Sequence, residues 1–73
     1  MTSIMTYEQV KNFYEDFKNN LPKDDFTRYY KEVSFMRTLI EFAKKQGLKE
    51  DVFEYKKIEE TATKKLRDLG YNI

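Results

Sequence analysis

The chain has 73 residues, of which 37% are charged, and 14 basic against 13 acidic residues leave a formal net charge of +1. Because it contains neither cysteine nor histidine, disulfides, the usual zinc ligands and the usual general base are excluded, and we expect a cytoplasmic protein. So balanced a charge gives no net attraction to nucleic acid or membrane, and the apolar runs are far shorter than the roughly 18 residues of a membrane span.

The first predicted helix covers residues 7–19. Thr6 and Gln9 have the spacing of a capping box at its start. Pro22, shortly after the helix, cannot continue it. One side of the helix carries apolar residues at helical spacing, and we expect these to face the core: Val10, Phe13, Tyr14 and Phe17.

The second and longest predicted helix covers residues 25–46. Asp24 is suited to cap its start, and Arg28 has the spacing to pair with Asp24 or Glu32. Gly47 is expected to end the helix in a left-handed Schellman turn. Because this turn is short, we expect the next helix to return antiparallel.

Apolar residues lie on two opposite faces of this second helix. At about 100° per residue, one stripe contains Phe26, Tyr29, Tyr30, Val33, Met36 and Ile40. The other contains Phe35, Leu39 and Phe42. The second stripe is either core, covered by another helix of the chain, or an interface that a second molecule covers.

The third predicted helix covers residues 50–69 and ends at Gly70, which Tyr71 is placed to lock. Its core stripe recurs at intervals of three and four residues and consists of Leu48, Val52, Tyr55, Ile58, Ala62, Leu66 and Leu69. Phe53 points about 100° or more away from that stripe. It therefore needs a neighbouring helix or a partner.

These patterns predict one all-α domain over residues 1–73, a small three-helix bundle with a long central helix and an antiparallel hairpin of the second and third helices. Catalysis is not expected, because adjacent acidic residues on a helix diverge by about 100° and do not converge on one proton or metal. The adjacent acids in question are Asp24 with Asp25, Glu50 with Asp51, and Glu59 with Glu60. No cofactor, metal or small-molecule substrate is indicated.

Protein binding is the function that the aromatic content favours. Six Phe and six Tyr exceed what so small a domain readily encloses, and aromatic anchors dominate interface energetics. The predicted binding residues are Phe35, Leu39, Phe42, Phe53 and Tyr71, with Tyr7 and Ile73 near the chain ends. We expect a non-enzymatic inhibitor or adaptor of phage or mobile-element type that binds a host protein, or a homodimer.

The alternative is a nucleic-acid-binding protein or a dimeric accessory to transcription regulation. Basic residues share the second helix with two tyrosines, and a second basic group lies on the third helix. Basic residues contact phosphates, and aromatic rings stack on bases. The candidates are Arg28, Tyr30, Lys31, Arg37, Lys56 and Lys57. Interleaved acidic residues are more typical of pairing on a helix surface than of a phosphate track.

Overall fold

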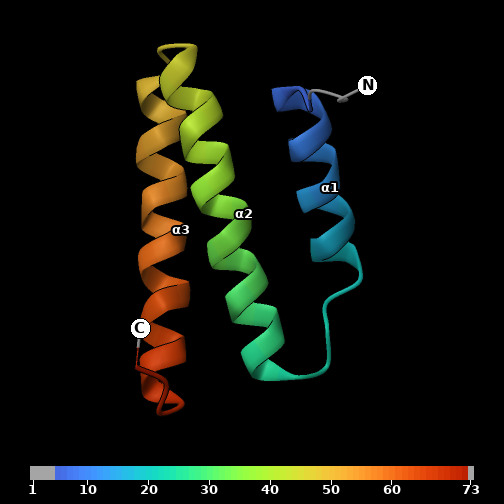
Figure 1. Cartoon of the computed structure of the whole chain (residues 1–73), viewed down its shortest axis with the longest axis vertical. Helices are drawn as coiled ribbons and strands as arrows, with labels where there is room; N and C mark the ends of the chain where they lie inside the picture. The colour runs from blue at the N-terminus through green and yellow to red at the C-terminus, as the bar shows by residue number, and fades with distance from the viewer. Residues whose placement is uncertain (1–4, 73) are drawn as a thin grey trace.

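The computed structural model describes residues 5–72 and contains three helices, α1 (Tyr7–Asn19), α2 (Asp25–Lys45) and α3 (Lys49–Asp68). They run down, up and down, with α2 between the other two in the view of Figure 1. The predicted all-α fold with its antiparallel α2/α3 hairpin is confirmed, and each helix end lies within one residue of its expected position. In the described part of the chain, no helix combines the length and apolar character of a membrane span.

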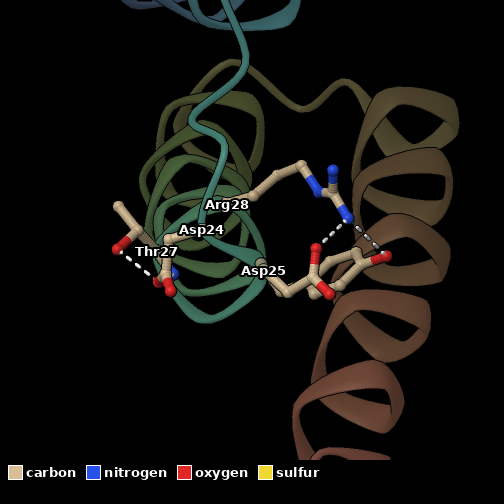
Figure 2. A network of polar contacts seen from close by, with 5 residues as sticks. Asp24, Asp25, Thr27 and Arg28 are labelled. Atoms are coloured by element: carbon tan, nitrogen blue, oxygen red, sulfur yellow. Dashed lines mark hydrogen bonds and ion pairs between the residues drawn. The ribbon is translucent and has the colours of Figure 1, made fainter.

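The starts of α1 and α2 are fixed by side-chain caps. In the capping box of α1, the Gln9 amide donates to Thr6 Oγ1 at 3.2 Å and the Thr6 amide donates to Gln9 Oε1 at 2.9 Å. At α2, Asp24 Oδ2 accepts hydrogen bonds of 2.8 Å from both the amide and the hydroxyl of Thr27 (Figure 2). Because these bonds favour the ionised carboxylate, they hold the pKa of Asp24 below its usual value.

The end of α2 is the predicted Schellman turn. Gly47 has a φ of 70°, which glycine adopts without the steric cost that a Cβ brings. Its amide donates to the Lys44 carbonyl at 3.1 Å, and the Leu48 amide donates to the Ala43 carbonyl at 2.9 Å. These two bonds reverse the chain into α3.

The end of α3 repeats the motif and fixes the aromatic residue that follows it. Gly70 has a φ of 97°, its amide donates to the Arg67 carbonyl at 2.9 Å, and the Tyr71 amide donates to the Leu66 carbonyl at 3.1 Å. The turn folds the Tyr71 ring back onto Phe26 of α2, with ring centroids 4.4 Å apart. The lock expected of Tyr71 is confirmed.

The core has two parts because α1 is shorter than α2. At 1.5 Å per residue, α1 is about 20 Å long and α2 about 32 Å, so α1 lies beside only the C-terminal part of α2 (Figure 1). Where all three helices meet, the buried residues are Tyr7, Val10, Tyr14, Met36, Leu39 and Ala43. The rest is a two-helix hairpin, in which Phe26 and Tyr29 pack on the buried Val33, Ala62 and Leu66.

The buried stripe of α1 differs from the predicted one. Tyr7, expected near an exposed chain end, is 8% exposed, whereas Phe13, expected in the core, is 50% exposed. The reason is the side of α1 against which the rest of the chain packs. This packing buries Tyr7, Val10 and Tyr14 of α1, whereas Phe13 lies about 100° around α1 from Tyr14. Ile73 lies outside the described residues.

Two tyrosine hydroxyls connect α1 to the other helices. Tyr7 Oη donates to Asp51 Oδ2 at 3.0 Å and lies 2.8 Å from Tyr55 Oη, both on α3. Tyr14 Oη donates to Glu32 Oε2 on α2 at 3.0 Å. Burial of the two rings, together with these hydrogen bonds, raises the pKa of both Tyr7 and Tyr14 above the usual tyrosine value.

Candidate protein-interaction site

None of the six phenylalanine side chains is buried in the folded chain. Phe13 and Phe53 are exposed, and the other four are half-buried: Phe17, Phe26, Phe35 and Phe42. Phenylalanine is ordinarily among the residues most often found inside a protein. The described fold therefore leaves part of every phenylalanine ring in contact with water.

Three of these rings line one hollow, which we call the α1/α2 groove. It has a volume of about 720 Å³ and lies between the two helices. Its apolar lining consists of Met5, Val10, Phe13, Phe17, Pro22 and Phe35. Its polar rims consist of Asp16 and Asn20 on one side and Lys31, Ser34 and Thr38 on the other.

The floor of the groove is built by packed rings. Phe17 and Phe35 lie with their ring centroids 5.3 Å apart, and Tyr14 lies 5.6 Å from Phe35 and 6.1 Å from Phe17. These separations fall in the favourable range for aromatic pairs. The bulky rings stand between the backbones of α1 and α2, and Phe13 adds an exposed ring at the edge of the groove.

Opposite charges stand on the two rims. Asp16 is on α1 and Lys31 is on α2. The Tyr14 to Glu32 hydrogen bond and the Phe17 to Phe35 ring contact show that the two positions lie at a similar height along the groove. Within residues 5–72, neither Asp16 nor Lys31 forms an ion pair.

The predicted protein-binding residues are spread over several parts of the fold. Phe35 lines the groove, and Phe42 is half-buried against α1. Leu39 is fully buried, which corrects the expectation that this residue faces a partner: α1 covers it. Phe53 and Tyr71 are 59% and 44% exposed but lie away from the groove.

Phe53 is isolated on the outer face of α3. It lies about 160° around the helix from the direction of the core residues, and α1 does not reach that face (Figure 1). The Lys57 ammonium lies 4.5 Å from the centre of its ring, a cation–π contact that partly covers the ring. Phe53 is thus a second exposed apolar point, separate from the groove.

The arginines of the nucleic-acid hypothesis are engaged within the chain. Arg28 Nη2 lies 2.7 Å from Asp25 Oδ1 and donates to Tyr29 Oη at 3.2 Å (Figure 2). The hydrogen bond to Tyr29 raises the pKa of Arg28. Arg37 Nε donates to Glu59 on α3 at 3.0 Å. Neither guanidinium is presented alone to a phosphate.

The remaining residues of that hypothesis are divided between α2 and α3. Lys31 is at the rim of the α1/α2 groove. Tyr30 packs on Phe26 with centroids 5.4 Å apart, whereas Lys56 and Lys57 are on α3. Nucleic-acid binding stays a prediction.

Sequence reasoning missed the groove because it assigned Phe13 and Phe17 to the core. The available signal was the spacing of the tyrosines: Tyr7, Val10 and Tyr14 form a stripe at intervals of three and four residues that leaves Phe13 to one side. No cluster of three or more acidic residues suited to a metal ion occurs within residues 5–72. No known protein family, curated protein or solved structure matched the chain.

Proposed function

We propose that this chain is a non-enzymatic protein-recognition module, an adaptor or inhibitor, whose α1/α2 groove accepts a helical segment of a protein partner. The observation that carries the proposal is the exposure of the phenylalanines, three of which line this groove. Helix-in-groove recognition requires an apolar channel with polar rims. The small size and aromatic-rich composition suit a mobile-element protein that blocks or recruits a host protein.

The groove has the composition that gives binding energy in known interfaces. Its lining is mainly apolar and aromatic, and the charged residues Asp16 and Lys31 stand at the rims. Central aromatic residues contribute most of the affinity, whereas rim charges mainly set orientation and association rate. Phe13 is the expected anchor because its half-exposed ring loses its water on docking.

The test compares retention of a protein by tagged wild-type chain with retention by Phe13→Ser. Tagged chain is exposed to bacterial lysate and, separately, to an untagged copy of itself. We expect retention to fall about tenfold or more in the variant, as for loss of an aromatic hot spot. Circular dichroism checks that the variant is folded.

Phe53→Ser is the matched control, since it removes a ring of similar exposure from the outer face of α3. We expect this control to retain the partner of the groove. If wild-type chain and Phe13→Ser retain the same proteins in the same amounts, the groove is not the recognition site. The absence of any specific retention by the wild-type chain would reject the proposal.

A further inference from the structure

We infer that the protein seated in the α1/α2 groove is a second copy of this chain, related to the first by a two-fold axis that runs along the groove. This inference rests on the proposed function, because it names the occupant of the same site. It is carried by the exposed ring at the rim and by the placement of two opposite charges on the two rims.

The exposed apolar side chains at the edge of the groove are suited to enter the same groove of a second copy. Phe13 stands at the edge and is 50% exposed, and Met5 beside it is 44% exposed. Under a two-fold axis, Phe13 of each copy enters the groove of the other, next to Phe17 and Phe35. One exposed ring and one apolar groove per chain therefore satisfy each other, as an isologous interface requires.

The rim charges select the direction of the axis. A two-fold axis along the groove exchanges its rims, so Asp16 of each copy meets Lys31 of the other at the same height. An axis across the groove would instead oppose Asp16 to Asp16 and Lys31 to Lys31. Opposite charges across an interface favour the first arrangement, and like charges penalise the second.

The backbone arrangement agrees with this choice. Because α1 and α2 are antiparallel within one chain (Figure 1), α1 of one copy also runs antiparallel to α2 of the other, which is the favourable alignment of helix dipoles. The short side chains of Ser34 and Thr38 at the α2 rim allow close approach. Phe53 of each copy lies on α3, outside this interface, and stays accessible to a further partner.

The test measures molar mass by sedimentation equilibrium over a range of concentrations. We expect twice the mass of the 8.9 kDa chain, and we expect Phe13→Ser to raise the dimer dissociation constant about tenfold or more. Phe53→Ser is the control and should leave this constant unchanged. A wild-type chain that stays monomeric up to millimolar concentration, or a dimer that is indifferent to Phe13→Ser, overturns the inference.

A charge exchange tests the direction of the axis. Asp16→Lys alone and Lys31→Asp alone each oppose like charges at both rims of the interface, so each should weaken dimerisation several-fold. The double variant Asp16→Lys with Lys31→Asp restores opposite charges and should recover wild-type association. Failure of the double variant to recover contradicts the two-fold arrangement.

A photocrosslinking phenylalanine analogue in place of Phe13 separates this inference from the proposed function. A covalent product of twice the chain mass supports the second copy as occupant. A product with a different protein, formed by a monomeric chain, overturns the inference and leaves the proposed function standing. If irradiation in cells gives no crosslinked product, both the inference and the proposed function fail. The same analogue in place of Phe53 is the control for nonspecific crosslinking.

Discussion

Replacing Tyr7 by phenylalanine should loosen α1 from α3 without disturbing the aromatic core. The substitution removes the hydroxyl that lies 3.0 Å from Asp51 Oδ2 and 2.8 Å from Tyr55 Oη. It keeps the ring, which stacks on Phe42 with centroids 6.1 Å apart. The change therefore isolates the hydrogen bonds from the packing.

The expected loss follows from the two bonds and their surroundings. A typical hydrogen bond contributes about 0.5 to 1.5 kcal/mol of net stability. Asp51 and Tyr55 are half-buried, so water partly replaces the lost hydroxyl, and we expect a total loss of about 1 to 2 kcal/mol. That is a substantial part of the about 4 to 11 kcal/mol typical of a domain of this length.

Urea unfolding followed by circular dichroism at pH 7 measures this loss. The midpoint should fall while the slope stays unchanged, because the unfolded surface is the same. Tyr30→Phe is the matched control, since Tyr30 is 55% exposed and removal of its hydroxyl should change the midpoint little. Equal midpoints for wild type and Tyr7→Phe would show that the link from α1 to α3 contributes no stability.

The same hydroxyl predicts a dependence on alkaline pH. Burial and hydrogen bonding raise the pKa of Tyr7 in the folded chain, so the neutral form is favoured by folding. The resulting stability is complete below the unfolded tyrosine pKa of about 10 and is lost as pH rises through the higher folded value. Wild type should lose stability more steeply above pH ~10 than Tyr7→Phe; parallel curves would contradict this assignment.

Three further substitutions test the core, the surface and the cap. Leu39→Ala should lower the free energy of unfolding by about 3 kcal/mol, because the side chain is fully buried, whereas Phe53→Ala should change it by no more than about 0.5 kcal/mol. Thermal unfolding of both variants measures the difference, and equal losses would show that Leu39 is not a core residue. Asp24→Ala should lower the urea midpoint at pH 7, and the difference from wild type should shrink as pH falls below about 3.9. The lowered pKa of Asp24 makes its contribution present above this unfolded value and lost as pH falls through the folded value. A difference that persists undiminished at pH 2 would exclude the carboxylate as its source.

The helices and their ends were determined by the sequence itself. Caps and Schellman turns are made between residues a few positions apart, so Thr6, Asp24, Gly47 and Gly70 specify them locally. The short connection at Gly47 also implied the antiparallel hairpin. Local hydrogen bonds of this kind do not depend on where a distant helix packs.

Which aromatic side chains are covered was decided only by the tertiary structure. Periodicity shows which residues share a face but not the angle at which a neighbouring helix approaches, and on α1 that angle exchanged the expected places of Tyr7 and Phe13. On α2 the same packing enclosed Leu39 and left Phe35 at the groove. The groove exists because a short α1 meets α2 through bulky rings, a long-range contact that no local pattern specifies.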